Sequence, residues 1–289
     1  MTEPGTLYIC ATPIGNLDDM TPRAAATLAQ ATVVAAEDTR RTAGLLHHLD
    51  IKKPLISYHE HNKASRGPEL IERLLAGDTI ALVSDAGFPG LSDPGEDLVK
   101  LALQAGITVI PLPGANAALC ALVASGLPAV PFFFGGFLPK TAKKRREQLA
   151  LWRDIPATLV LYEAPHRLQS MLTDLLASLG DRDMAMAREL TKLHEEFFRG
   201  KISQCLERSQ TIAPRGEYTL VIAPPSATDA AELEQDTRSP EERAVAEVRR
   251  LVATGRDKKE AVREAAKNLS LPKRLVYQAT LALLHRGGS

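Results

Sequence analysis

The stretch Ala81-Leu82-Val83-Ser84-Asp85-Ala86-Gly87-Phe88-Pro89-Gly90-Leu91-Ser92-Asp93-Pro94-Gly95 decides the fold of this 289-residue chain. The apolar run over residues 79–83 predicts a buried strand, and a helical pattern resumes near Glu96. Between them, the glycines let the backbone come close to a ligand and the prolines stiffen the loop. Open α/β sheets bind their ligands in loops placed like this one, after a strand. Because its aspartates make a poor phosphate site, we expect a ligand with hydroxyl, amine or positively charged groups.

Strands and helices alternate on both sides of this loop. Apolar runs predict strands over residues 7–11, 32–36, 55–57 and 108–111. Thr21 followed by Pro22 is typical of a helix start. The alternation predicts an α/β domain over residues 1–112, with a parallel sheet covered on both faces.

The segment Leu112-Pro113-Gly114 is the expected hinge to a second, α+β domain over residues 113–225 with a mixed sheet. A small-residue helix is predicted over 115–124, and strands over 132–137, 158–162, 184–188, 195–199 and 218–223. Residues 226–238 are acidic and poor in large apolar residues, which predicts a linker. Residues 239–289 are expected to form a basic appendage of three helices, with Ser239, Asp257 and Ser270 at their starts.

The composition argues against a global nucleic-acid-binding surface, because 35 Lys and Arg residues balance 35 Asp and Glu residues. Local basic clusters remain. Residues 256–274 hold seven basic and three acidic residues, and residues 140–146 hold five basic ones. Either cluster is expected to bind phosphates or to form an ordinary solvated or dimer-forming surface.

The cysteines, the first residues and the lengths of the apolar stretches predict the cellular compartment. Cys10, Cys120 and Cys205 lie far apart and are expected to be buried free thiols. The first residues lack the pattern of a signal peptide, and no apolar stretch has membrane-spanning length. We therefore expect a soluble cytoplasmic protein. The seven histidines lack the spacing of metal ligands, so no metal site is expected.

A series of short motifs along the chain resembles the tetrapyrrole-methylase superfamily. They are the central loop, the turn over residues 12–16, Ala36-Glu37-Asp38-Thr39-Arg40, Tyr58-His59-Glu60-His61-Asn62, Pro111-Leu112-Pro113-Gly114, Gly136-Phe137-Leu138-Pro139, Tyr162-Glu163 with His166-Arg167, Ala187-Arg188-Glu189-Leu190-Thr191-Lys192, and Glu195-Glu196 running to Arg199-Gly200. The match is closer to the branch that methylates the 2′-oxygen of a cytidine in small-subunit ribosomal RNA, and it covers about residues 5–225. The family usually has Thr at the position of Phe88, and Pro then Ser or Cys at Ala115 and Asn116.

The resemblance implies that S-adenosylmethionine is the methyl donor and that it binds folded between the two domains. It also implies small-subunit ribosomal RNA or the small subunit as partner, and a homodimer. The donor contacts that it implies are Pro13, Ser84, Asp85, Ala86, Gly87, Pro113, Gly114, Ala115, Asn116, Ala117, Tyr162, Ala187, Arg188, Glu189, Leu190 and Gly216.

Methyl transfer to a ribose hydroxyl needs a group that takes the hydroxyl proton. Candidates at predicted strand ends are Asp38, His61, Glu163 and His166, with Glu37 as a further one, and we favour Glu163 or His61. Arg40 and Arg167 are the expected phosphate contacts. A structural hydrogen bond for each histidine, and an ion pair with Glu37 or Glu163 for each arginine, are the alternatives.

Two other functions stay open. The chain could methylate a small tetrapyrrole-like substrate, although the basic appendage and the closer motif match favour RNA. It could also bind the donor or RNA without turnover, since Phe88 and Asn116 depart from the usual pattern.

Overall fold

The computed structural model describes residues 3–226, 239–253, 256–269 and 271–284. The chain divides into two compact units, Met1–Pro225 and Ser226–Ser289. The described residues of the first unit hold two five-stranded sheets, and those of the second unit hold three helices. The expected domain boundaries stay predictions. Of the expected linker over residues 226–238 only Ser226 is described, and the expected cap Ser270 also lies outside the described residues.

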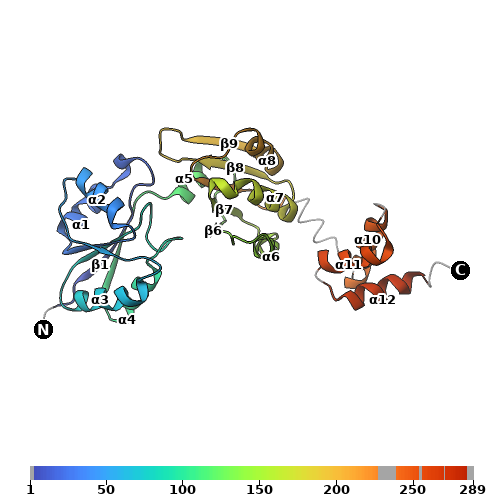
Figure 1. The fold of residues 1–289 in the computed structure, drawn as a ribbon, viewed down its shortest axis with the longest axis horizontal. Coiled ribbons are helices and arrows are strands. Elements are labelled where there is room, and N and C mark those ends of the chain that lie inside the picture. Colours follow the sequence, from blue (N-terminus) through green and yellow to red (C-terminus); the bar gives the residue numbers. More distant parts are fainter. Residues whose placement is uncertain (1–2, 227–238, 254–255, 270, 285–289) are drawn as a thin grey trace. The chain divides into compact units, whose positions relative to one another are not determined.

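The first sheet has the strand order β3-β2-β4-β1-β5, and all its strands are parallel, as predicted. Helices α1 and α2 cover one face, while α3 and α4 cover the other (Figure 1). The bounds are β1 Thr6–Cys10, β2 Val33–Ala36, β3 Leu55–Ser57, β4 Ile80–Val83, β5 Thr108–Leu112, α1 Pro22–Gln30, α2 Thr39–His48, α3 Lys63–Leu75 and α4 Glu96–Gln104.

Parallel pairing places the loops that follow β1, β2, β4 and β5 at one edge of this sheet. The central strand β4 is buried along its whole length because it has a neighbouring strand on each side and helices on both faces. Thr21 caps α1 by accepting a hydrogen bond from the backbone N–H of Ala24 at 3.2 Å, as predicted. The motifs of the first domain therefore lie close together at this edge of the sheet.

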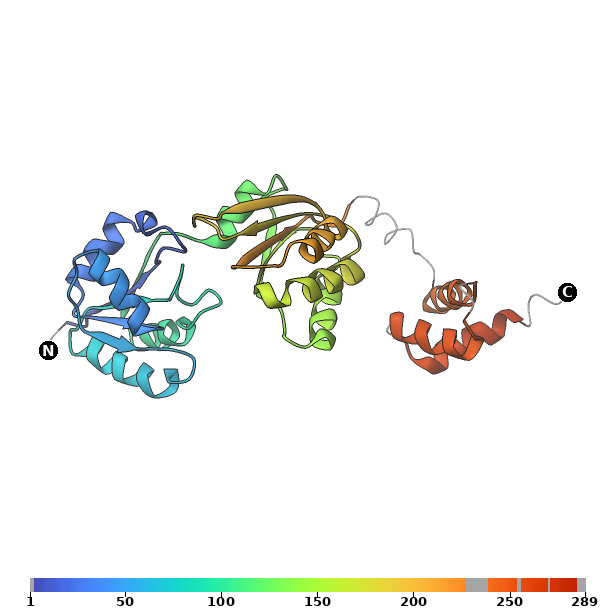
Figure 2. The same ribbon diagram turned by 45° about the horizontal axis from the view of Figure 1, so that its top comes forward.

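The second sheet has the order β6-β7-β10-β8-β9 and is mixed, as predicted. The β6–β7 pair is parallel, and the other pairs of this sheet are antiparallel. Helix α5 covers one face, and α6, α7 and α8 pack on the other (Figure 2). The bounds are β6 Phe132–Phe137, β7 Thr158–Glu163, β8 Asp183–Arg188, β9 Glu196–Lys201, β10 Tyr218–Ile222, α5 Ala117–Ala124, α6 Ala142–Trp152, α7 Leu168–Leu179 and α8 Ile202–Thr211, with short 3₁₀ turns at η1 Leu17–Asp19 and η2 Pro165–Arg167.

Helices α10 Pro240–Ala253, α11 Lys258–Asn268 and α12 Lys273–Leu284 form the second unit around a core of small and branched apolar residues. Ser239 and Glu242 cap α10 reciprocally, and the Asp257 carboxylate caps α11 by accepting from the N–H of Lys259. The seven basic residues over 256–274 are all exposed. The described residues of this unit therefore form a small packed core with a basic surface.

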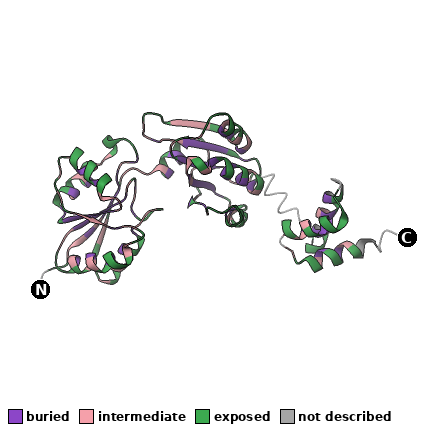
Figure 3. Cartoon of the chain, in the orientation of Figure 1, coloured by how far each residue is buried: buried purple, intermediate pink, exposed green. Residues whose placement is uncertain are grey.

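Buried residues concentrate on the strands and on the inward faces of the helices (Figure 3). Cys10 and Cys205 are buried free thiols, as expected, but the expectation was wrong for Cys120, which is exposed. Cys120 lies on the eight-residue helix α5, whose buried positions are Ala118, Ala121 and Leu122. Position 120 therefore falls on the outer side of the helix.

Candidate active site

A cleft of about 510 Å³ lies between the loops of the first sheet and the end of the second. Its wall comes from the loops after β2 and β4, the start of α5, the ends of β6 and β7, the loop after β8 and the start of β10. Sites for small molecules have about 300–1,000 Å³ and combine apolar walls with a few placed polar groups. The cleft therefore has the size and lining of a small-molecule site.

The central loop is held in place by its own hydrogen bonds. The N–H of Thr12 donates to the carbonyl of Gly87 at 2.9 Å, and the N–H of Gly87 donates back at 3.0 Å. The Thr12 hydroxyl donates to the carbonyl of Ser84, and the Ser84 hydroxyl to that of Gly87. Gly87 has a φ of +83°, which a residue with a side chain rarely adopts. Ser84 thus holds the loop from behind, while residues 85–88 face the cleft.

Three carboxylates gather on the side of the cleft formed by the first sheet. The N–H of Asp85 donates to Glu37 at 3.3 Å, and the N–H of Asp38 donates to Asp85 at 3.1 Å. Burial, and then repulsion from Glu37 and Asp85, raises the pKa of Asp93 to about 7. Burial also raises the pKa of Glu37. Arg41 offsets part of this negative charge through an ion pair with Asp85 at 3.2 Å.

The start of α5 forms a second part of the wall. Asn116 caps the helix by accepting from the N–H of Leu119 at 2.9 Å, a task that Ser performs equally well. The Tyr162 hydroxyl accepts from the N–H of Ala118 at 3.2 Å, and burial raises the pKa of that hydroxyl. The rings of Phe134 and Tyr162 pack edge to face at 5.1 Å. The departure at Asn116 therefore preserves the helix cap.

The loop after β8 closes the cleft from the second sheet. Glu189 has a φ of +51°, and its carboxylate accepts from the N–H of Glu217 and from Lys192, each at 2.9 Å. A Cβ added at Gly216 would lie 2.4 Å from Cδ of Glu189, so this position needs glycine. Thr191 accepts from the N–H of Asn16 at 3.0 Å, which joins this loop to the one after β1.

Glu163 ends β7 on the cleft wall and is 1 % exposed. Its Oε1 accepts from the N–H of Ala164 at 2.8 Å and lies 3.3 Å from Nε of Arg167. The guanidinium of Arg167 also donates to the carbonyls of Leu138 and Pro139. Burial raises the pKa of Glu163, while these donors act in the opposite direction. Arg167 is therefore engaged with the protein itself rather than turned to the cleft.

The structure brings ten of the sequence-predicted site residues together on the cleft. They are Asp85, Ala86, Gly87, Asn116, Ala117, Tyr162, Glu163, His166, Glu189 and Leu190. The other predicted residues do not line it. Of these, Pro13, Ser84, Ala115 and Gly216 are next to lining residues along the chain, and Pro113, Gly114 and Ala187 lie two or three residues from one.

The remaining predicted catalytic residues have other contacts. Asp38 caps α2 and pairs with Arg40 at 2.7 Å, and this hydrogen bond holds the pKa of Asp38 well below its usual range. The Arg40 side chain is 89 % exposed. His61 is exposed, and its ring packs against that of His59 at 6.0 Å. None of the three lines the cleft, so their assigned roles lack support from the geometry.

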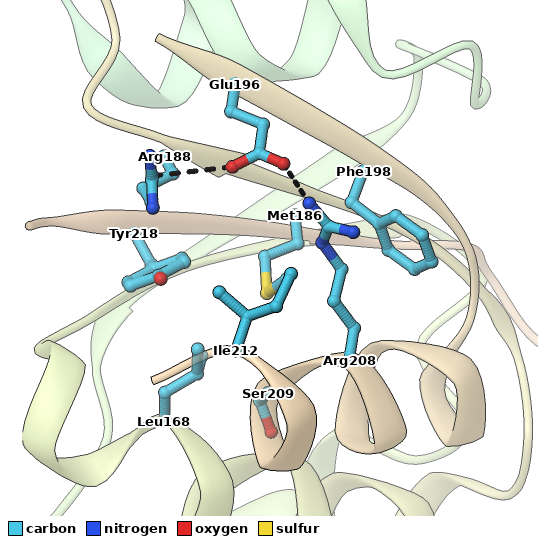
Figure 4. Close-up of a pocket in the computed structure, with 9 residues that line it drawn as sticks. All are labelled: Leu168, Met186, Arg188, Glu196, Phe198, Arg208, Ser209, Ile212 and Tyr218. Atoms are coloured by element: carbon cyan, nitrogen blue, oxygen red, sulfur yellow. Dashed lines mark hydrogen bonds and ion pairs between the residues drawn. The ribbon is translucent and has the colours of Figure 1, made fainter. Parts of the chain in front are cut away.

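Arg188 lines a separate cavity of about 20 Å³, which has room for about one water molecule (Figure 4). Nε of Arg188 lies 3.6 Å from Glu196, whose carboxylate also pairs with Arg208. Figure 4 shows both arginines turned toward this carboxylate. The Arg188 side chain thus belongs to an ion-pair network between β8, β9 and α8, and its expected donor contact stays a prediction.

Sequence reasoning did not assign several lining residues to the site. Asp93 belongs to the central loop, and its position there was a usable signal. Phe137 sits in a recognised motif, where it was given no role. Lys192 likewise ends a recognised motif, where it was given no role. Arg41 and Glu217 carried no local signal, because they reach the cleft only through the packing of α2 and of the residues before β10.

Neither metal binding nor membrane insertion has a matching feature in the described part of the chain. No group of three or more His, Cys, Asp or Glu side chains among the described residues is arranged to hold a metal ion. No helix within the same described ranges is both long and apolar enough to cross a membrane.

Residues 6–206 match the profile of the Tetrapyrrole (Corrin/Porphyrin) Methylases. The chain is 48% identical over 276 residues to a protein of Halalkalibacterium halodurans named Ribosomal RNA small subunit methyltransferase I, covering 95% of this chain and 94% of the relative. It is 47% identical over 280 residues to a protein of that name from Synechocystis sp., covering 96% and 98%.

Solved structures share the fold at lower identity. Uroporphyrin-III C-methyl transferase from Thermus thermophilus, complexed with S-adenyl homocysteine, superimposes with a TM-score of 0.54 at 18% identity, covering 76% of this chain and 97% of that one. A diphthine synthase gives a TM-score of 0.57 at 14% identity, covering 80% and 95%. These likenesses confirm the fold class expected from the motifs.

Proposed function

The chain belongs to the tetrapyrrole (corrin/porphyrin) methylase family, and we propose that it transfers a methyl group from S-adenosylmethionine to the ribose 2′-oxygen of a cytidine in small-subunit ribosomal RNA. The observation that carries this proposal is the match to ribosomal RNA small subunit methyltransferases over 95% of the chain. Cytidine and its 2′-oxygen follow from the motif resemblance.

The cleft fits the donor. S-adenosylmethionine supplies a methyl group that is already activated, so the protein has mainly to orient two substrates and exclude water. The three carboxylates suit a ligand that carries a sulfonium and an ammonium group. We assign its contacts to Asp85–Gly87, Asn116, Ala117, Tyr162, Glu189 and Leu190, with Pro13, Ser84, Pro113–Ala115, Ala187 and Gly216 shaping the wall from behind.

The hydroxyl proton needs an acceptor on the cleft wall, and we assign that role to Asp93. Glu37 and Asp85 already accept backbone N–H groups, and Glu163 is fixed by Ala164 and Arg167. Asp93 accepts from the Ser84 hydroxyl, which can rotate away. Asp93 lines the cleft, and its pKa of about 7 suits a base that works near neutral pH. His166 also lines the cleft and is exposed, which places it within reach of an entering RNA strand.

The second unit carries exposed basic side chains that can bind RNA phosphates. All seven basic side chains over residues 256–274 are exposed, so they can meet a phosphate backbone. The cluster over residues 140–146 is different, because Arg145 is buried against Asp174. Lys140, Lys143 and Lys144 remain exposed there.

The proposal also includes the cellular compartment and the oligomeric state. A substrate made of ribosomal RNA implies a cytoplasmic protein. A homodimer is supported by the outer face of α5, where the side chains of Leu119 and Val123 are exposed.

The function is tested by incubating the protein with tritiated donor and unmodified small ribosomal subunits, with free ribosomal RNA and with a tetrapyrrole precursor. We expect label in the RNA of the subunit or the free RNA. Label in the tetrapyrrole alone would move the assignment to small-molecule methylation, and donor binding without any label would point to a binding protein.

A further inference from the structure

Strand β6 contains a bulge that turns one of its aromatic rings toward the cleft. Phe134 of β6 pairs with Val160 of β7, and the register then shifts before Gly136. Phe137, three residues after Phe134, pairs with Tyr162, which is only two residues beyond Val160. Because side chains alternate along a regular strand, a spacing of three would place the two phenylalanines on opposite faces. The extra residue of the bulge therefore brings Phe137 to the same face as Tyr162.

The ring contacts agree with this placement. The ring centroid of Tyr162 lies 5.1 Å from that of Phe134 and 5.5 Å from that of Phe137. The Tyr162 hydroxyl accepts from the N–H of Ala118 at 3.2 Å, which fixes the ring between its neighbours. Phe137 and Tyr162 both line the cleft, and Phe137 is 54 % exposed. The cleft wall thus presents an exposed aromatic ring on a rigid support.

The glycine before Phe137 ties the bulge to the central loop. Gly136 has a φ of +58°, which a residue with a side chain rarely adopts. A Cβ added at Gly136 would lie 2.9 Å from Oγ of Ser92, so the backbone here lies against the central loop. Ser92 is next to Asp93, the proposed base. The bulge therefore places the ring of Phe137 next to the part of the loop that carries this carboxylate.

Exposed lysines follow the ring along the chain. Lys140 is exposed, and its Cα lies at most about 11 Å from that of Phe137, since only three residues separate them. Lys143 and Lys144, in the first turn of α6, are exposed as well. Sites for unpaired nucleic acid combine aromatic rings with basic side chains that contact the backbone. This combination fits a nucleotide of the RNA better than the methyl donor, which has no phosphate.

We propose that the base of the target nucleotide stacks on the ring of Phe137 while its ribose faces Asp93. This inference rests on the proposed function. A nucleotide that enters the cleft leaves the stack of its neighbours in the RNA, and an aromatic ring replaces part of that lost contact. Every base has a flat face, so Phe137 holds the nucleotide in place without selecting its identity.

The first test measures methylation of the small-subunit RNA substrate by variants of Phe137. Phe137→Ala should lower kcat/KM for the RNA by about tenfold to a hundredfold, the loss expected for one base–aromatic stack. Phe137→Tyr keeps the aromatic face and should retain most of the activity, whereas Phe137→Leu keeps an apolar side chain and should not. Phe132→Ala is the matched control, because Phe132 is an exposed ring of the same strand that does not line the cleft. It should keep the wild-type kcat/KM.

The second test uses an RNA whose target residue is an abasic ribose. This substrate keeps the 2′-hydroxyl but has no base to stack, so the wild-type protein and Phe137→Ala should methylate it with equal kcat/KM. Calorimetry with S-adenosylmethionine should give the same donor affinity for both proteins. Equal donor affinity also shows that the variant is folded.

Wild-type activity of Phe137→Ala on the normal RNA, full rescue by Phe137→Leu, or an undiminished effect of Phe137→Ala on the abasic RNA would overturn the inference and leave the proposed function intact. A loss of donor affinity that matches the loss of activity would overturn it in favour of a contact between Phe137 and the donor. Absence of RNA methylation by the wild-type protein would overturn both the proposed function and the inference.

Discussion

At the residue scale, Asp93 is the proposed base, and its raised pKa gives predictions for both activity and stability. A base must be ionised to accept a proton, and the pKa of Asp93 is about 7. We expect the methylation rate to fall as pH drops below about 7, and Asp93→Asn to lose on the order of 10²–10⁴ in kcat at every pH. Rate measurements from pH 5.5 to 9 test this. A variant that keeps the wild-type profile would assign the proton elsewhere.

Ionisation of the same carboxylate also changes the free energy of unfolding. Its folded pKa lies above the ordinary value of 3.8, so the folded state holds the proton longer than the unfolded state does. Folding is therefore disfavoured progressively as pH rises from about 4 to 7. Asp93→Asn should match the wild type at pH 4 and exceed it by about 1–2 kcal/mol at pH 8, after allowing for partial solvent screening. Urea unfolding at both pH values provides the comparison.

Gly216 offers a second residue-scale prediction. An alanine there would push on Glu189, whose carboxylate organises the turn facing the donor. We expect Gly216→Ala to weaken donor binding about tenfold, as measured by calorimetry. Gly106→Ala is the matched control, because Gly106 has the same φ of +72° and nothing within 4 Å of its added Cβ. If both variants bind the donor equally, the contact with Glu189 is unimportant.

At the element scale, the cap of α5 links helix stability to the cleft. Asn116→Ala removes the acceptor for the N–H of Leu119 and should cost about 1 kcal/mol in unfolding free energy. Because Asn116 and Ala117 line the cleft, donor affinity should fall as well. Asn116→Ser keeps a capping oxygen and should restore both values. Failure of Ser to rescue donor binding would mean that the amide group itself touches the donor.

The first turn of α6 contains one buried basic residue, Arg145, beside exposed basic residues. Nε of Arg145 donates to Asp174 at 2.7 Å, and both side chains are almost wholly buried. Removing one partner of a buried pair costs about 3–5 kcal/mol, so Arg145→Ala should lower the melting temperature strongly. Lys144→Ala, at the preceding exposed position, should leave it within a degree or two. Similar melting temperatures for the two variants would contradict the buried pair.

Local sequence patterns predicted the elements better than the site. Apolar runs separated by helical spacing were enough for the parallel first sheet, because each βα unit is close in sequence. The placement of Glu217 and Lys192 on the cleft depends on the pairing of β8 with β10, which no local pattern encodes. The motif around Glu163 was recognisable, but the ion pair of Glu163 with Arg167, which also donates to the carbonyl of Leu138, depends on the packed turn after β6.

At the scale of the whole molecule, the proposed function assigns the chemistry to the first unit and part of the RNA binding to the second. The first unit holds the cleft, and the second carries a described surface rich in exposed Lys and Arg. Replacing Lys258, Lys259, Lys273 and Arg274 by Ala should weaken RNA binding and make the slope of log K against log salt shallower, by about 0.7–0.9 for each phosphate that is no longer neutralised. Donor affinity should stay unchanged. An unaltered salt slope would exclude this surface from RNA binding.

In the proposed reaction, the cleft delivers the donor methyl group to a ribose oxygen of cytidine in small-subunit RNA. Its most direct test uses donor with a deuterated methyl group, unmodified small subunits, and mass spectrometry of the nucleosides and fragments released from the RNA. We expect one labelled nucleoside, 2′-O-methylcytidine, at one position. Label on a nucleobase, on another nucleoside or nowhere in the RNA would contradict it.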